Sequence, residues 1–373
     1  MAEPTRLPGE GRPTWSLNRM AEAFALVDAW TASGEVPGLA VCVGQAGATL
    51  EKLAGRVSNE PKAGPIGPET LFLAASLTKP VIAVAVMQMV ERGWLALDES
   101  VASILPEFAA ESKGLVRVRH LLAHTSGLPD MLPDNDALRA SFSPNDAFVA
   151  GSCRQPLLFP PGSRSWYSSM AFAVLGAIIS KLSELPLPEA LASQIFRPLG
   201  MTDTSLGASP DRQARVARIQ LDPETKRTQH HWNSPYWLGL GSAWGGLITT
   251  AADYARFLRM ALDGGSLDGV RILGSASARL MTANQTATFP GIEAETRRLR
   301  PWGLGWRLMW PGTSAYFGDL VGPRGFGHWG ATGTVAWADP DSDSFAVILS
   351  TLPQGIEGAY LARLSNAIVS ALC

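Results

Sequence analysis

Residues 80–90 contain no charged side chain, and Gln88 is the only polar one among them. A helix that is apolar on nearly every face has to be buried, so this pattern predicts a central buried helix. The preceding residues 71–75 are apolar and predict a short strand that leads into it. Ser76 and Lys79 therefore lie at the junction of a buried strand and a buried helix.

The rest of the chain divides into segments of strand and helix pattern. Residues 17–31 carry an apolar stripe at helical spacing, and two short apolar segments, 39–43 and 49–54, flank a glycine-containing turn typical of a hairpin. From 97 to about 206 the pattern is helical. The remaining expected elements are the helices 98–105, 118–124, 144–151, 168–183, 188–196, 251–262, 275–282 and 355–372, and the apolar segments 303–309, 333–338 and 344–351.

Strand patterns early and late, with helices between them, indicate an α/β (α+β) fold. The N- and C-terminal parts are expected to share one antiparallel sheet, with the helical block packed on one side of it. We expect an α/β domain from 1–96 and 207–373, an inserted helical domain from 97–206, and the active site at their interface. The polar, irregular segment 284–300 is expected to be a mobile loop.

Composition excludes several classes of protein. The 373 residues are 46% hydrophobic and 17% charged, and the net charge of -2 argues against a nucleic-acid or anionic-membrane partner. No uncharged stretch is long enough to span a bilayer, and the N-terminus lacks a secretory signal, so we expect a cytoplasmic protein. Cys42, Cys153 and Cys373 are odd in number and have no metal-ligand spacing, so neither disulfides nor a zinc site are expected.

Three short motifs could carry chemistry. Ser76 and Lys79 are three residues apart, so in a first helical turn their side chains can meet. Tyr167 stands at the start of a second helix, and His328 lies in a glycine-dense run that enters a late strand. Each has a simpler interpretation: Ser76 as a helix cap beside a surface lysine, Tyr167 as a turn anchor, and His328 as a hydrogen-bonded structural histidine.

Taken together, the order Ser-x-x-Lys, Tyr-x-Ser and His-Trp-Gly resembles the beta-lactamase-like serine hydrolases. That group includes class C beta-lactamases, D-alanyl-D-alanine carboxypeptidases and family VIII esterases, and related acyltransferases. Further similar segments are 70–72, 120–128, 160–162, 198–201 and 245–247 with Asp253, so the resemblance extends from about residue 17 to the C-terminus.

The residue types suggest a mechanism. A serine hydroxyl is a poor nucleophile until a base takes its proton. We expect Tyr167 to act as that base, with Lys79 stabilising the developing phenolate, and Ser76 to carry an acyl intermediate. The resemblance implies that the backbone amides of Ser76 and Ala331 bind the oxyanion. No metal and no organic cofactor are expected.

Departures from the family pattern favour esters. His328, Trp329 and Gly330 stand where class C beta-lactamases have Lys-Thr-Gly, so the cation that would bind a substrate carboxylate is replaced by a mostly neutral side chain. Ser169 replaces the asparagine of Tyr-x-Asn. Trp166, Trp244 and Trp329 adjoin the three motifs and suggest an aromatic pocket for an apolar acyl group.

The leading hypothesis is therefore an esterase-type hydrolase acting on a small-molecule ester or amide. The alternatives are an acyltransferase that passes the acyl group to an alcohol or amine acceptor, a weak beta-lactamase or D-amino peptidase, and a silent binding protein that keeps the fold. The sequence defines neither the natural substrate nor the oligomeric state. Asp253 is expected to cap or orient the 251–262 helix. His124 and Ser126 are expected to form a turn rather than a second catalytic triad.

Overall fold

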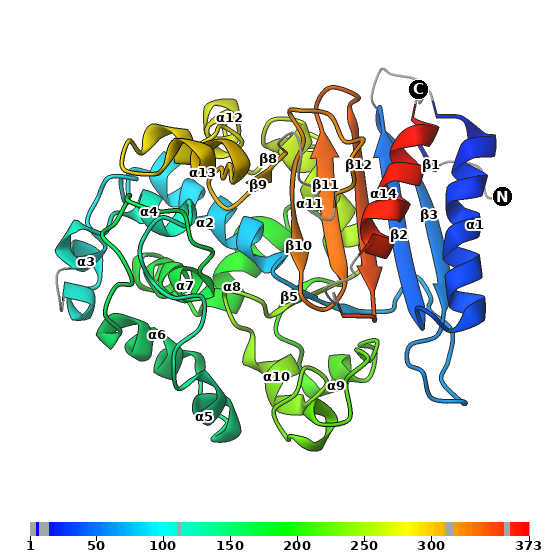
Figure 1. The fold of residues 1–373 in the computed structure, drawn as a ribbon, viewed down its shortest axis with the longest axis horizontal. Helices are drawn as coiled ribbons and strands as arrows, with labels where there is room; N and C mark the ends of the chain where they lie inside the picture. Colours follow the sequence, from blue (N-terminus) through cyan, green and yellow to red (C-terminus); the bar gives the residue numbers. More distant parts are fainter. Residues whose placement is uncertain (1–4, 7–14, 110–112, 310–316, 354–358, 373) are drawn as a thin grey trace.

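The computed structural model describes residues 5–6, 15–109, 113–309, 317–353 and 359–372. Its main feature is a seven-stranded sheet of order β1-β3-β2-β12-β11-β10-β9, in which all neighbours are antiparallel (Figure 1). The N-terminal strand β2 pairs directly with the C-terminal strand β12. The expected sheet shared by both ends of the chain is thus confirmed. Its strands are β1 Thr5–Arg6, β2 Gly38–Gln45, β3 Ala48–Gly55, β9 Arg307–Leu308, β10 Phe326–Gly330, β11 Thr334–Asp339 and β12 Ser344–Ser350.

Both faces of this sheet are covered. Side chains alternate between the faces of a strand, so Leu39, Val41 and Val43 of β2 face α1 (Leu17–Ser33) and α14 (Ala359–Ala371). Ala40 and Cys42 lie in the core on the opposite side, which α11 (Ala251–Leu262) covers (Figure 1). Because both faces are buried, the central strands are apolar at nearly every position.

The helical block lies beside the sheet, with α2 (Thr78–Glu91) between the two (Figure 1). Every residue of α2 from Thr78 to Met89 is buried, as the absence of charge predicts. The C-cap of α2 is Arg92, and Gly93 follows in the left-handed conformation with φ 70°. Other elements of the block are α3 Val101–Ile104, η1 Pro106–Ala109, η2 Lys113–Leu115, α4 Val118–Leu122, α5 Asn135–Ala140, α6 Asn145–Arg154, α7 Ser169–Ser183, α8 Leu187–Leu191 and η3 Ala192–Phe196.

A second, three-stranded sheet of order β4-β6-β5 carries the segment before Ser76. Its strands are β4 Phe72–Ala75, β5 Ser205–Leu206 and β6 Leu247–Thr249. The remaining elements are α9 Pro210–Gln213, η4 Thr225–Arg227, α10 Pro235–Leu240, β7 Ser266–Leu267, β8 Val270–Arg271, α12 Ser275–Met281, η5 Thr286–Thr288 and α13 Ala294–Leu299.

Two expectations need correction. The segment 284–300 is not irregular throughout, because it contains η5 and α13. The capping role expected for Asp253 is wrong: the Thr250 hydroxyl accepts the Asp253 amide, while the Asp253 carboxylate accepts from the Asp203 amide and the Thr204 hydroxyl, each at 2.8 Å. Threonine and aspartate both cap helices, so the residue types do not show which of Thr250 and Asp253 is the cap. The contact of the Asp253 carboxylate with Thr204, which is distant in sequence, makes the difference.

Other expectations concern the cysteines, the membrane and the domains. Cys42 and Cys153 are free and buried, and Cys373 lies outside the described residues.

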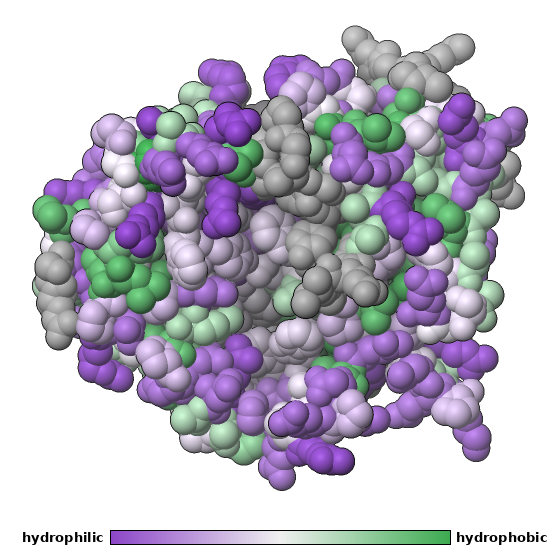
Figure 2. All heavy atoms as spheres, viewed as in Figure 1, coloured by the Kyte–Doolittle hydropathy of each residue, from purple (hydrophilic) through white to green (hydrophobic). Residues whose placement is uncertain are grey.

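Within the described ranges no single helix is long and apolar enough to cross a membrane, although the bent pair formed by α7 and 187–196 passes by length and composition. The face in Figure 2 is mostly hydrophilic, and its apolar residues form small separate groups. The domain boundaries stay a prediction.

Candidate active site

Ser76 lies at a sharp turn between β4 and α2. The β4–β6 register shifts between Leu73 and Ala75, and Ala75 adopts the left-handed conformation with φ 47°, which is uncommon for a residue other than glycine. The backbone therefore departs from the extended conformation of β4 at Ala75, one residue before Ser76. Ser76 itself remains partly exposed, whereas the residues on either side of the turn pack into the core.

Side-chain hydroxyls hold this turn by its carbonyl groups. Thr332 donates to the Leu73 carbonyl at 2.7 Å, and Thr334 donates to the Ala74 carbonyl at 2.9 Å. Thr78 donates to the Ala75 carbonyl at 2.6 Å, and Tyr254 donates to the Leu77 carbonyl at 2.9 Å. All four bonds are buried or partly buried, where an unpaired carbonyl would be costly. The strained turn is thus fixed by contacts from three separate parts of the chain.

Lys79 lies in the first turn of α2 and has no exposed surface. Its Nζ donates to the Trp244 carbonyl at 2.8 Å and lies 2.9 Å from the Ser76 Oγ. Burial disfavours the charged ammonium and lowers the pKa of Lys79 to about 7, although the charge of Asp130 opposes this shift. The neutral amine is therefore far more populated near pH 7 than in an ordinary lysine.

Tyr167 approaches Ser76 from the helical block. It precedes α7, whose N-cap residue Ser168 accepts the Ala171 amide. The Tyr167 hydroxyl lies 2.9 Å from the Ser76 Oγ, and the Lys79 Nζ lies 4.8 Å from the centre of its ring. Burial raises the pKa of the Tyr167 phenol above its usual range, so the phenol keeps its proton at neutral pH. The structure thus brings the hydroxyl and amine of the first motif and the phenol of the second to one point.

Strand β10 closes the third side of the site. A Cβ at Gly330 would lie 2.5 Å from the Ala74 carbonyl oxygen and 3.0 Å from the Ala75 Cβ, so only glycine allows β10 to lie this close to β4. Ala331, the next residue, is exposed. Among the described backbone hydrogen bonds, none has the Ser76 or Ala331 amide as its donor.

His328 does not face solvent. It is fully buried, and burial together with the charge of Lys79 lowers the pKa of its imidazole to about 3, so the ring is neutral. Its ring centre lies 6.0 Å from that of Tyr167 and 5.8 Å from that of Trp302. In this arrangement His328 supports the wall of the site and offers no surface to a substrate.

The other predicted binding residues occupy different depths. Trp329 is half-buried and stacks on Tyr167 at 6.2 Å, and Trp166 is 51% exposed. Trp244 is buried and contacts Lys79 through its carbonyl rather than its indole. Ser169 is buried too, and its amide donates to the Asp130 carboxylate at 2.9 Å.

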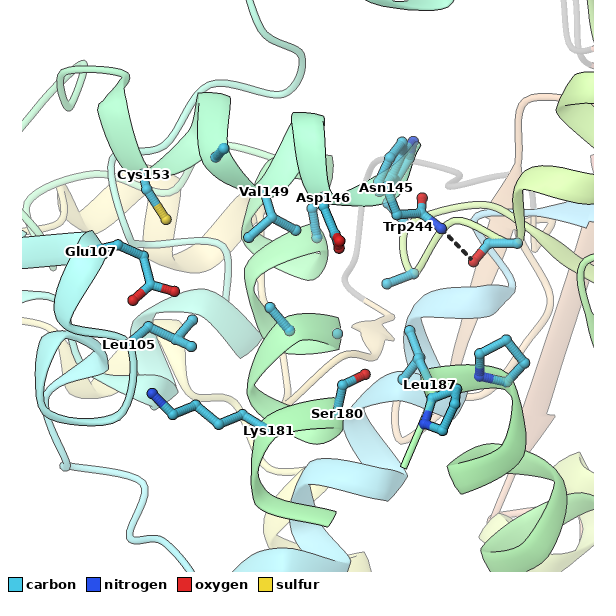
Figure 3. Close-up of a pocket in the computed structure, with 18 residues that line it drawn as sticks. Leu105, Glu107, Asn145, Asp146, Val149, Cys153, Ser180, Lys181, Leu187 and Trp244 are labelled. Carbon is cyan, nitrogen blue, oxygen red and sulfur yellow. Dashed lines mark hydrogen bonds between the residues drawn. The ribbon is translucent and has the colours of Figure 1, made fainter. Parts of the chain in front are cut away.

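Trp244 also lines a separate cavity of about 660 Å³ between α6 and α7 (Figure 3). Asn145 lies at the same end of this cavity as Trp244, whereas Glu107 and Lys181 lie at the other end (Figure 3). Ser76, Lys79 and Tyr167 do not belong to its lining.

Sequence reasoning missed three residues near the reacting groups: His124, Asp130 and Trp302. The His124 ring lies 4.7 Å from the Tyr167 ring and 4.3 Å from that of Trp302. His124 belongs to the 120–128 motif and Asp130 follows it closely, so the motif was a usable signal for these two. Nothing in the sequence around Trp302 marks it as a site residue.

An antiparallel sheet built from both ends of the chain, a flanking helical block, and a serine between a lysine and a tyrosine define the class of beta-lactamase-fold serine enzymes. Comparison with known proteins agrees. The Beta-lactamase family description matches residues 23–369, so the chain belongs to the Beta-lactamase family. This confirms the resemblance inferred from the three motifs.

Individual relatives differ in their activities. Penicillin-binding protein 4 of Amycolatopsis lactamdurans is 33% identical over 322 residues, which cover 82% of this chain and 77% of that protein. Esterase EstB of Burkholderia gladioli is 35% identical over 222 residues, 55% of this chain and 56% of the esterase. The structure of EstCE1, described as a hydrolase with promiscuous acyltransferase activity, superposes with a TM-score of 0.77 at 20% identity and covers 94% of this chain and 99% of that one. The protein is therefore an enzyme of the Beta-lactamase family.

Proposed function

We propose that the protein is an esterase-type hydrolase that forms an acyl intermediate on Ser76. The observation that carries the proposal is the position of the Ser76 Oγ, 2.9 Å from both the Lys79 Nζ and the Tyr167 hydroxyl. A serine held between an amine and a phenol can lose its proton to one group while the other supplies a proton to the leaving group.

Lys79 is the better first base. Its amine has a pKa of about 7, whereas the phenol of Tyr167 has a raised pKa and therefore holds its proton. The Trp244 carbonyl can only accept, so it takes an N–H of Lys79 and leaves the nitrogen lone pair free to face Ser76. The sequence motifs predict Tyr167 as the base in this step, whereas the pKa directions favour Lys79.

In the acylation step, every proton that one group releases is taken up by another. The Ser76 proton moves to the Lys79 Nζ as the Oγ attacks the substrate carbonyl carbon, and the amides of Ser76 and Ala331 stabilise the oxyanion. When the tetrahedral intermediate collapses, the Tyr167 hydroxyl protonates the departing oxygen, and the Lys79 ammonium stabilises the phenolate and restores its proton. Water attacks the acyl-enzyme by the reverse route and releases the acid.

The surroundings of Ser76 favour an apolar ester. His328 is neutral and fully buried, so it supplies no positive charge to bind the carboxylate of a penicillin or a D-alanyl peptide. Trp329 and Trp166 present aromatic surface instead. Such surface binds acyl chains and planar groups without requiring a charge.

Acyl transfer to an alcohol or amine is the second candidate. EstCE1, which shares the fold, is described as having promiscuous acyltransferase activity. The half-buried Trp329 beside Tyr167 would also hold an apolar acceptor near the acyl group. The difference between the two functions lies in whether water or the acceptor reaches acyl-Ser76.

Turnover of p-nitrophenyl esters with acyl chains of increasing length tests the proposal. We expect hydrolysis that is lost in Ser76→Ala, faster turnover with longer chains, and slow hydrolysis of nitrocefin. Added alcohol or amine measures the partition of the acyl group; transfer with negligible hydrolysis would replace the hydrolase by the acyltransferase. Nitrocefin turnover that exceeds ester turnover would contradict the ester preference, and a folded protein that neither turns over esters nor reacts with a fluorophosphonate would indicate a silent binding protein.

A further inference from the structure

His124 contacts three consecutive residues of the segment that carries Tyr167. The His124 carbonyl accepts the Trp166 amide at 2.8 Å, its Nδ1 accepts the Ser168 amide at 3.1 Å, and its ring lies 4.7 Å from the Tyr167 ring between them. We propose that His124 is the positioning residue of Tyr167. The inference rests on the proposed function, in which Tyr167 must stay within hydrogen-bond distance of Ser76.

The segment before α7 has no other regular structure to fix it, since residues 164–168 form neither helix nor strand. A reacting group has to be held to within about half an ångström, and such precision requires support from packed or hydrogen-bonded neighbours. Phe172 and Trp302 also pack against the His124 ring, at 5.3 and 4.3 Å. The imidazole is thereby held in place. Its Nδ1 holds the backbone after Tyr167 through the Ser168 amide, and the His124 carbonyl holds the backbone before it through the Trp166 amide.

The hydrogen-bond pattern defines the tautomer of His124. Because the Ser168 amide points at Nδ1, the neutral ring carries its proton on Nε2. Nε2 is buried and has no hydrogen-bond partner among the described residues. The charged and titratable groups around the ring are Lys79, Tyr167, His328 and Arg307, and burial together with the charge of Lys79 lowers the pKa of His124 well below its usual range. His124 is therefore a neutral acceptor.

The backbone of His124 suggests the test. Its φ is 56°, in the left-handed region, where asparagine is tolerated better than most residues. The Oδ1 of asparagine can also replace Nδ1 as the acceptor for the Ser168 amide. In contrast, phenylalanine keeps the ring but removes the acceptor and leaves a buried N–H unpaired.

The experiment compares His124→Asn and His124→Phe with the wild type by crystal structure and by ester hydrolysis as a function of pH. Phe196→Leu, a buried change elsewhere in the helical block, serves as the control for stability loss alone. We expect His124→Asn to keep kcat within about 3-fold. We expect His124→Phe to lower kcat by roughly 30-fold or more, because a displacement of about 1 Å at a reacting group has effects of this size. In that variant KM should change little, the acid limb set by Lys79 should stay in place, and the Tyr167 hydroxyl should have moved away from Ser76.

Three results would overturn the proposal. The first is full kcat in His124→Phe, and the second is an equal loss of kcat in His124→Asn and His124→Phe at equal thermal stability. The third is a shift of the acid limb of the pH–rate profile, which would indicate that His124 acts electrostatically on Lys79. A wild type without ester turnover would contradict the proposed function instead. In that case the crystal structures decide about His124, since an unmoved Tyr167 hydroxyl in His124→Phe would show that His124 does not position it.

Discussion

Two lysines in the described part of the chain are fully buried, and their surroundings differ. Lys113, in η2, donates through Nζ to the carbonyls of Ser152, at 3.0 Å, and Cys153. These carbonyls lie in the last turn of α6, where backbone oxygens lack partners within the helix and a cation is favourable. Lys79, in contrast, binds one carbonyl and faces the hydroxyl of Ser76.

The comparison shows that burial alone does not identify a functional lysine. Both ammonium groups are removed from water, and both lie near an aromatic ring, Phe108 at 5.1 Å for Lys113 and Tyr167 at 4.8 Å for Lys79. The Lys113 contacts satisfy the end of a helix and so serve stability. Burial lowers the pKa of Lys79, so the folded state disfavours its charged form, and the amine lies beside the Ser76 hydroxyl.

Replacing Lys79 should give the largest effect. We expect Lys79→Met to lower kcat/KM for esters by about 1,000-fold or more, because Ser76 loses its base. At pH 7 the variant should unfold at a higher temperature than the wild type, since an apolar side chain replaces a buried amine. Between pH 7 and about 10.5 the unfolded wild type binds a proton at Lys79 that the folded state has released, so wild-type stability rises with pH and the gap should narrow. A variant that is less stable at pH 7, or fully active, would contradict this account.

Replacing Lys113 should have the opposite consequences. Lys113→Met leaves two carbonyls of α6 without their ammonium partner, which should cost about 2 kcal/mol and lower Tm by several degrees. Ester hydrolysis should stay within about 2-fold of the wild type. Lys62→Met, at an exposed lysine, is the matched control and should change neither quantity. Unchanged stability or a large loss of activity in Lys113→Met would remove the contrast between the two sites.

The smallest expected effect concerns Asp130. Its charge raises the pKa of Lys79, so Asp130→Asn should lower that pKa and move the acid limb of kcat/KM to lower pH. The asparagine Oδ1 can still accept the Ser169 amide, so folding should be preserved. A pH–rate profile of wild type and variant measures the shift; a limb that stays in place or moves to higher pH would show that Asp130 does not act on Lys79.

The contrast between the two lysines also marks the limit of sequence reasoning. The uncharged run 80–90 predicts that α2 is buried, and the spacing of Ser76 and Lys79 predicts that their side chains meet; both are observed. The helix expected over 251–262 likewise matches the bounds of α11. These features are local, since periodicity and short spacing express them directly.

Contacts between distant segments could not be predicted in this way. Nothing near Lys113 indicates that it binds carbonyls about forty residues further along the chain. Thr332 and Thr334 read as ordinary strand and turn residues, yet their hydroxyls hold the carbonyls before Ser76. His124 could be interpreted as a turn residue, which its backbone conformation agrees with, but its imidazole acts on the segment around Tyr167.

The most direct test of the central claim is the intact mass of the protein after brief exposure to a p-nitrophenyl ester or a fluorophosphonate, followed by mapping of the modified peptide. The account predicts one adduct of the acyl or phosphonyl mass, located on Ser76 and absent from Ser76→Ala. An adduct that persists in Ser76→Ala, or ester consumption by the wild type through a residue other than Ser76, would contradict it.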